Sequence, residues 1–247
     1  MSFFNSSEAH FILQSCRPSR RLRLIGWLLP LVAMAVYLAR WDVPTVAWLG
    51  FSPDGRTLAA LIVTNSRIPV RKLVLWDMPS WKRRAALELS ISPLRGAYSP
   101  DSRLLAVTST QSTFPHGTVS IRDTSNGGEL RTFRAHNWTI TGLAFSPDGR
   151  TLATASAVDD DSPVRLWDAT DGSQQANFPQ AFSVYCLAFS PDGKKLAVAG
   201  LDGPVRVADL GSGTSSVAWQ DLPGSERFAL FAPDGELLIT GQPRPGF

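Results

Sequence analysis

Short apolar runs separated by polar turn residues recur along most of the chain. Thr57-Leu-Ala-Ala-Leu61 and Lys195-Leu-Ala-Val-Ala199 are two examples. Runs of this length, bounded by Gly, Pro, Asp and Ser, are typical of β-strands. Because small and apolar residues occupy both faces of these runs, we expect strands that lie between neighbouring sheets. The pattern therefore predicts an all-β fold over residues 43–247.

One turn motif, aromatic-Ser-Pro-Asp-Gly in its commonest form, separates neighbouring runs. It begins at Phe51, Tyr98, Phe145, Phe189 and Phe231. These starts are 47, 47, 44 and 42 residues apart, a period that suits a four-stranded unit repeated in tandem. Proline presets φ at about −65°, Asp bonds its own backbone and Gly accepts a positive φ, so each copy predicts a hairpin. The turn residues are Pro53, Asp54, Gly55, Pro100, Asp101, Pro147, Asp148, Gly149, Pro191, Asp192, Gly193, Pro233, Asp234 and Gly235.

A third run follows each of the first four turns and ends in Asp. It reads Lys72-Leu-Val-Leu-Trp-Asp77 in the first copy and Val164-Arg-Leu-Trp-Asp168 in the third, and a more polar run such as Glu129–Phe133 comes next. With this period, turn and Trp-Asp ending, residues 43–247 resemble the WD-repeat family of β-propellers. The resemblance implies blades of four strands that present binding loops on a rigid disc.

The last copy of the repeat is shorter than the others. Phe231–Phe247 spans 17 residues, and after Leu237–Thr240 the prolines stop a further strand. We therefore expect four full blades and a half fifth blade. The strand edges left open by this arrangement predict self-association, or pairing with further sequence of a longer protein.

The third repeat also carries the residue types of the structural tetrad of WD repeats. The tetrad residues implied by the resemblance are His136, Ser156, Asp161 and Trp167. A Ser-His-Asp hydrolase uses three of the same types, but its nucleophile needs an exposed turn and an oxyanion hole. Because Ser156 ends a regular strand, we expect a buried hydrogen-bond chain and no catalytic residue. Arg122 and Ala208 stand at the Trp position of the second and fourth repeats, so these blades are expected to depend on apolar packing.

An apolar segment precedes the repeats. Residues 24–39 carry no charge and lie between Arg23 and Arg40. The run approaches the lower limit of about 17 residues for a membrane-spanning helix, and the flanking Arg side chains can reach the interfaces. Because the Arg residues are concentrated before the run, the positive-inside rule predicts a basic cytoplasmic tail (1–23), a transmembrane signal anchor (24–39) and an extracytoplasmic repeat domain. A cleaved signal peptide and a buried soluble helix are the alternatives.

The charge distribution separates the two parts of the chain. The net charge of +3 comes from residues 1–42, and residues 43–247 hold 19 basic and 19 acidic residues. The basic arm therefore implies anionic lipid headgroups, and no nucleic-acid partner is expected. Three His and two Cys are scattered, and Asp159–Asp161 lacks the spacing of a calcium loop. We expect no metal site and no cofactor.

The sequence therefore favours a membrane-anchored WD-repeat protein-interaction scaffold, whose protein partners the sequence does not identify. Binding residues are expected on the loops Asn65–Arg67, Gln111–His116 and Asp159–Ser162. One alternative is a fragment or degenerate copy of a longer sensor protein in which WD repeats follow a transmembrane helix. Another is an exported propeller enzyme, which would need a cluster of acids, His or metal ligands that the sequence does not contain.

Overall fold

The computed structural model describes residues 44–64, 71–89, 92–110, 116–156, 164–178, 183–200, 204–219 and 226–242. The expected basic tail (1–23) and apolar segment (24–39) lie outside these residues. Within the part of the chain that is described, no helix has the length and apolar character needed to cross a membrane. The membrane anchor therefore stays a prediction.

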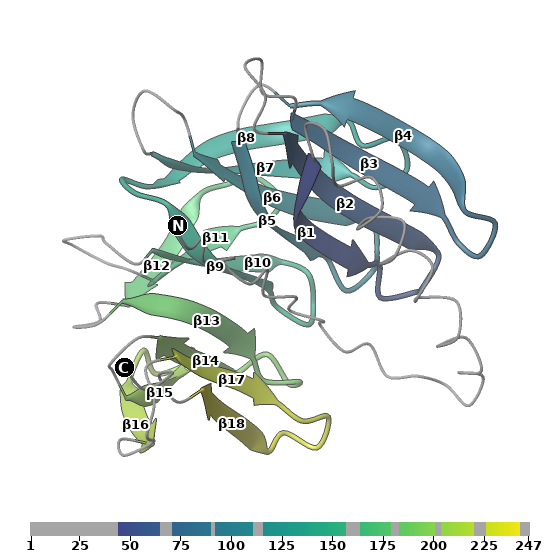
Figure 1. Ribbon diagram of the computed structural model, residues 1–247. Coiled ribbons are helices and arrows are strands. Elements are labelled where there is room, and N and C mark those ends of the chain that lie inside the picture. Colours follow the sequence, from purple (N-terminus) through teal and green to yellow (C-terminus); the bar gives the residue numbers. More distant parts are fainter. Residues whose placement is uncertain are drawn as a thin grey trace, which may run out of the picture.

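The described residues form antiparallel sheets that follow one another along the chain (Figure 1). Blade 1 contains β1 (Pro44–Phe51), β2 (Thr57–Thr64), β3 (Arg71–Asp77) and β4 (Lys82–Glu88). Blade 2 contains β5 (Ser92–Tyr98), β6 (Leu104–Thr110), β7 (Gly117–Asp123) and β8 (Glu129–His136). Blade 3 contains β9 (Ile140–Phe145), β10 (Thr151–Ser156), β11 (Val164–Asp168) and β12 (Gln174–Phe178). Blade 4 contains β13 (Val184–Phe189), β14 (Lys195–Gly200), β15 (Val205–Asp209) and β16 (Ser215–Trp219), and a last sheet pairs β17 (Glu226–Phe231) with β18 (Leu237–Gln242).

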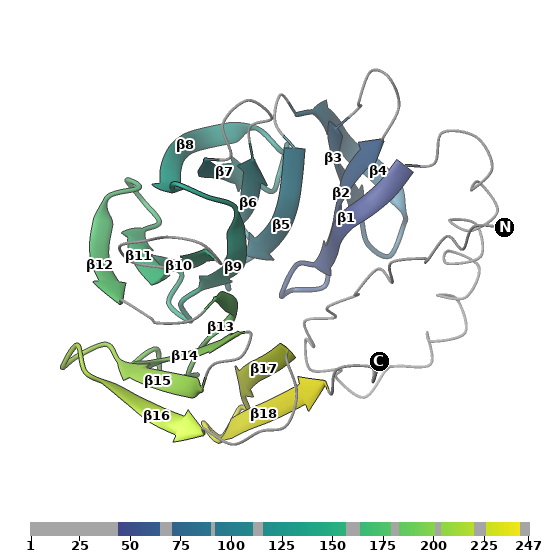
Figure 2. The same cartoon turned by 60° about the vertical axis from the view of Figure 1, so that its left-hand side comes forward.

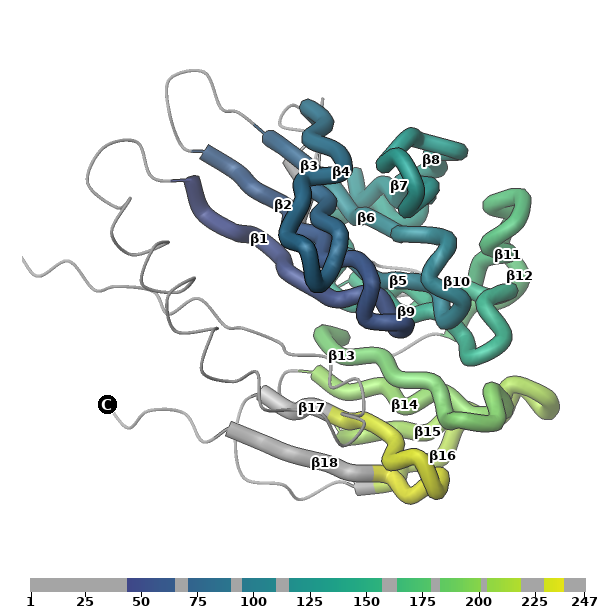
Figure 3. Tube along the Cα trace, turned by 90° about the vertical axis from the view of Figure 1, so that its right-hand side faces the viewer, coloured from purple at the N-terminus to yellow at the C-terminus, as the bar shows by residue number. Residues whose placement is uncertain are grey.

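The blades fan out around a centre, as Figure 2 shows. Each strand pairs with the next one in the sequence, and the first strands of successive blades contact each other, from β1 with β5 to β13 with β17. Seen from the side, β17 lies against β13 and β14 (Figure 3). The expectation of an all-β fold built from four-stranded, WD-like blades is confirmed, and the described residues end in a two-stranded sheet.

The predicted hairpins form at all five turn motifs, and in the first four the serine of the motif stabilises the hairpin. Ser146 Oγ donates to Asp148 Oδ1 and accepts the backbone N–H of Thr151, at 2.5 Å and 2.9 Å. The fourth residue of each turn has positive φ, and it is Ser102 in the second copy, with a φ of 65°. The same serine bonds recur at Ser52, Ser99 and Ser190. The turn pattern alone did not indicate this role of the serine.

Apolar side chains of facing sheets form a buried cluster at each junction between blades. Leu61, Leu75 and Leu105 belong to the cluster between blades 1 and 2. The middle strands are thus covered on both faces, as their composition predicts. At the start of the series, β1 turns Trp48 toward blade 2 and leaves Phe51 exposed on its other side. Blade 1, which the sequence predicts to have an open edge, therefore has an apolar outer face.

Candidate functional site

Two residues of the predicted tetrad, His136 and Trp167, lie in a buried hydrogen-bond chain together with Thr154, which the sequence pattern did not single out. Thr154 Oγ1 accepts the indole N–H of Trp167 at 2.9 Å and lies 2.8 Å from His136 Nε2. His136 and Thr154 have no exposed surface, and Trp167 is only 6% exposed. The chain ties β8 of blade 2 to β10 and β11 of blade 3. It is a structural connection inside the protein.

Thr154 and Ser156 lie two residues apart on β10, so they share one face of the strand. The tetrad predicted from the sequence contains Ser156, the second of these two hydroxyls. Ser156 is also fully buried, whereas Asp161 lies outside the described residues. The parts of Ser156 and Asp161 in the tetrad therefore stay predictions.

Blade 2 replaces the tetrad tryptophan by a polar network, which corrects the expectation of apolar packing alone. Arg122 is 8% exposed and pairs with Glu129 Oε2 at 2.9 Å. It also donates to the carbonyl of Gly127, and Ser120 donates to the same Glu129 oxygen. Burial lowers the pKa of Arg122, and the charge of Glu129 opposes this shift. An arginine at this position is stable because its charge is paired and hydrogen-bonded.

Little of the expected binding loops falls within the described residues. Asn65–Arg67 and Asp159–Ser162 lie outside them, and of Gln111–His116 only His116 is described. His116 Nδ1 lies 3.3 Å from the carbonyl oxygen of Asn137. These loops stay predictions.

The turn motifs of successive blades lie side by side. A Cβ atom on Gly149 would lie 3.6 Å from Pro100 Cδ, and one on Gly193 would lie 3.6 Å from Pro147 Cδ. The backbone N–H of Asp54 donates to Ser102 Oγ of the next turn at 3.1 Å. The first four turns therefore form a row across successive blades.

A groove of about 670 Å³ opens in this row, between blades 3 and 4. We call it the blade 3–4 groove. Its apolar lining comes from Leu166, Phe189 and Leu210, and its polar lining includes Thr151 and Gln175. A concave surface with an apolar interior and a few polar groups is typical of a binding site.

Two carboxylates lie at the edge of the blade 3–4 groove. The hydroxyls of Ser146 and Ser190 are the main cause of the lowered pKa values of Asp148 and Asp192, and the backbone N–H groups of Arg150 and Lys194 add to the effect. Both carboxylates are therefore ionised at neutral pH. Gln175 donates to Asp168 Oδ2 and accepts from Thr151 Oγ1, each at 3.3 Å. The groove is thus rich in hydrogen-bond acceptors.

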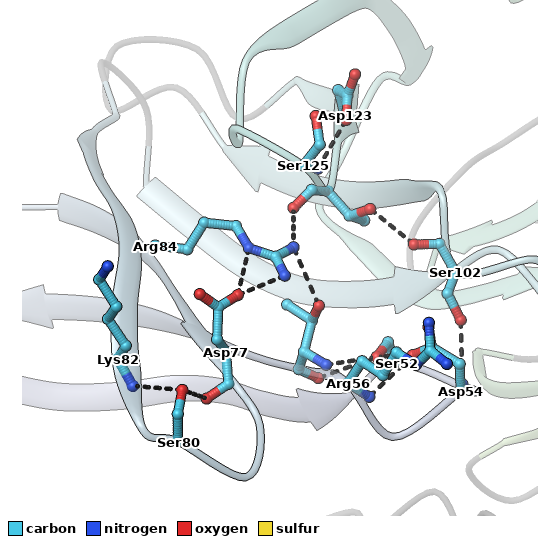
Figure 4. Close-up of polar contacts among 12 residues, drawn as sticks. Ser52, Asp54, Arg56, Asp77, Ser80, Lys82, Arg84, Ser102, Asp123 and Ser125 are labelled. Carbon is cyan, nitrogen blue, oxygen red and sulfur yellow. Dashed lines mark hydrogen bonds and ion pairs between the residues drawn. The ribbon is translucent and has the colours of Figure 1, made fainter.

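At the corresponding junction between blades 1 and 2, an arginine makes polar contacts with both blades, as Figure 4 shows. Arg84 donates through Nε to Asp77 Oδ1 at 2.6 Å, and its Nη1 donates to Thr57 Oγ1 at 3.2 Å. The same Nη1 reaches the carbonyl oxygen of Thr124 in blade 2 at 3.1 Å. Arg84 therefore links blade 1 to blade 2 through three acceptors.

Tandem four-stranded antiparallel blades, joined by recurring hairpins and tied by a His-Thr-Trp chain, define a repeat protein of the β-propeller class. The family described as "WD domain, G-beta repeat" matches residues 127–168 and 172–209. These two segments of the chain are therefore WD repeats.

Two curated proteins align with the chain. The target of rapamycin complex subunit wat1 of Schizosaccharomyces pombe is 32% identical over 146 residues, which are 58% of this chain and 44% of that protein. The uncharacterized WD repeat-containing protein sll1491 of Synechocystis sp. is 26% identical over 129 residues, 51% of this chain and 32% of that protein. The aligned region is less than half of each relative.

Proposed function

We propose that this chain is a WD-repeat protein-interaction scaffold tethered to a membrane through residues 24–39. The observation that carries the scaffold proposal is the row of fastened turns interrupted by the blade 3–4 groove, whose lining comes from two repeats. Binding residues placed on rigid turns lose little conformational freedom when a partner docks. The relative wat1 is, by its name, a subunit of a complex, which agrees with such a role.

The tether rests on the sequence alone. Residues 24–39 are uncharged and apolar, and most of the nearby Arg residues precede them. A tether would hold the row of turns at a fixed distance from the bilayer and raise the local concentration of membrane-bound partners.

Site-specific photo-crosslinking tests the scaffold role. A photoreactive residue replaces Pro147 or Pro191 in the row of turns, and the full-length chain is expressed in its native host. We expect discrete crosslinked adducts of higher mass from both positions. The same probe in a Trp167→Ala background serves as the control, because loss of the buried indole should unfold blade 3 and abolish the adducts. Absence of adducts in the folded protein would contradict the scaffold function.

A further inference from the structure

The register of the fourth strands places three residues at one equivalent position. In blade 1, Leu75 pairs with Ala85 and Trp76 with Arg83, so Arg84 is the extra residue of a β-bulge. The same irregularity makes Leu130 the extra residue in blade 2 and Gln175 the extra residue in blade 3. A bulge re-aims its side chain out of the normal alternation.

Gln175 repeats two of the contacts of Arg84. The hydroxyl of Thr151 and the carboxylate of Asp168 correspond to Thr57 and Asp77 of blade 1. In the described part of the chain, the side-chain hydrogen bonds of Gln175 stay within blade 3. Arg84 makes a third contact, with the carbonyl of the next blade, because its guanidinium extends further. The blade 3–4 junction thus keeps the acceptors of the blade 1–2 junction but has a shorter side chain between them.

On the blade 4 side of the groove, a smaller side chain also replaces a larger one. Phe189 stands where blade 2 has Tyr98, since each ends the first strand of its blade. Among the described residues the buried Tyr98 hydroxyl has no hydrogen-bond partner, and burial raises its pKa. Phenylalanine has no hydroxyl at this position. Both replacements enlarge the space between blades 3 and 4.

The junction between blades 2 and 3 contains another arginine. Arg131 pairs with Ile121, and the corresponding residue of blade 3 is Ala176. Arg131 Nε is buried, and after the bonds from Ser173 the charge of Arg131 contributes to the lowered pKa of Asp171 in the blade 3 turn. Each of these two junctions therefore receives a guanidinium from the chain itself, whereas the blade 3–4 groove is lined by Gln175 and Ala176.

We propose that the blade 3–4 groove binds an arginine side chain presented by a protein partner. This inference rests on the proposed scaffold function and names the chemistry that one of its sites recognises. The guanidinium takes the position that Arg84 occupies between blades 1 and 2, with Asp168, Thr151 and the Leu210 carbonyl as its acceptors. The methylene stem packs against the apolar lining, as Arg stems do on apolar surfaces.

The groove should favour arginine over lysine. Asp148 and Asp192 add negative charge at the edge, but the exposed Arg150 and Lys194 lie two residues after them and offset much of it. Recognition therefore depends on the planar fork of donors, which fits several fixed acceptors at once, more than on net charge. Lysine, a compact point charge, meets fewer of these acceptors.

Fluorescence anisotropy with the full-length chain in detergent tests the inference. The probes are three labelled hexapeptides, identical except for one central arginine, lysine or citrulline. We expect the arginine peptide to bind about tenfold more tightly than either of the others. Equal affinities, or no saturable binding of the arginine peptide to the folded chain, would overturn the proposal.

A self-blocking variant makes the test specific to this groove. Gln175→Arg supplies the missing guanidinium from the chain itself, so it should weaken arginine-peptide binding about tenfold and leave the melting temperature unchanged or higher. Leu130→Arg is the matched control, because it adds the same charge at the equivalent, 53% exposed position of blade 2 and should leave binding unchanged. Unaltered binding in folded Gln175→Arg would refute the proposal.

The two proposals fail separately. If partners still crosslink to the row of turns while the arginine peptide does not bind, the scaffold function stands and the arginine site is wrong. If the arginine peptide binds and no partner crosslinks, the groove binds arginine but the scaffold function is wrong.

Discussion

Thr154→Val is the sharpest test of the buried hydrogen-bond chain. The substitution keeps the shape and volume of the side chain and removes its hydroxyl. The indole N–H of Trp167 and the ring nitrogen of His136 would then each lose a partner in a fully buried setting. An unpaired buried polar group costs about 1–3 kcal/mol, so two give about 2–4 kcal/mol when local relaxation is allowed for.

For a repeat region of this size, that loss corresponds to a melting temperature lower by about 4–16 °C. Thermal unfolding followed by circular dichroism measures it. Thr154→Ser is the matched control, because it keeps the hydroxyl and should cost less than about 1.5 kcal/mol. Trp167→Phe removes the donor, so adding Thr154→Val to it should cost less than Thr154→Val alone. A Thr154→Val protein that melts like the wild type would refute the hydrogen-bond chain as a stabilising element.

Three further predictions concern pH, the membrane and assembly. The turn serines hold the pKa values of Asp101, Asp148 and Asp192 below 3.8, so these carboxylates stabilise the fold above their unfolded pKa, and this contribution is lost as pH falls below about 4. In acid titrations, the stability of the double variant Ser146→Ala/Ser190→Ala should therefore depend less on pH than that of the wild type. An unchanged pH dependence would contradict this account. Alkaline carbonate should leave the full-length chain in the membrane pellet; its release would exclude an anchor at 24–39, and a mature N-terminus at Val36 would favour the signal-peptide alternative. Light scattering of residues 43–247 should detect dimers or larger species. Phe51→Glu should reduce the amount of these species, because Phe51 is exposed on the outer face of β1. A monodisperse wild-type monomer would show that the open blade does not drive association.

The repeat period and the turn chemistry were sufficient to predict the four-stranded blades. Both are local signals, since Pro, Asp and Gly act on the backbone within a few residues. The hydrogen-bond chain was predicted only in part. Thr154 and Ser156 satisfy the same alternation, and only the pairing of β10 with β11 shows which hydroxyl Trp167 reaches.

The blade 3–4 groove could not be predicted from periodicity. It depends on Gln175 standing where blade 1 has Arg84, and the two can be equated only after the bulges in β4 and β12 are known. A bulge adds one residue to a polar strand, which leaves no mark in the hydrophobic pattern. Arg122 was misjudged for a related reason, because Glu129, the partner that pairs with it, lies on the next strand.

Each fastened hairpin carries its own closure within about six residues of chain, so a blade does not need distant sequence to form its first turn. The last hairpin differs, because Ala232 stands where the others have serine, so the serine bonds are lost while the backbone bonds and the bond from the Glu236 N–H to Asp234 Oδ1 remain. Amide hydrogen exchange should therefore be fastest in β17 and β18 and slower in the preceding blades. Local unfolding should therefore begin in the sheet of β17 and β18 and then reach the preceding blades one after another.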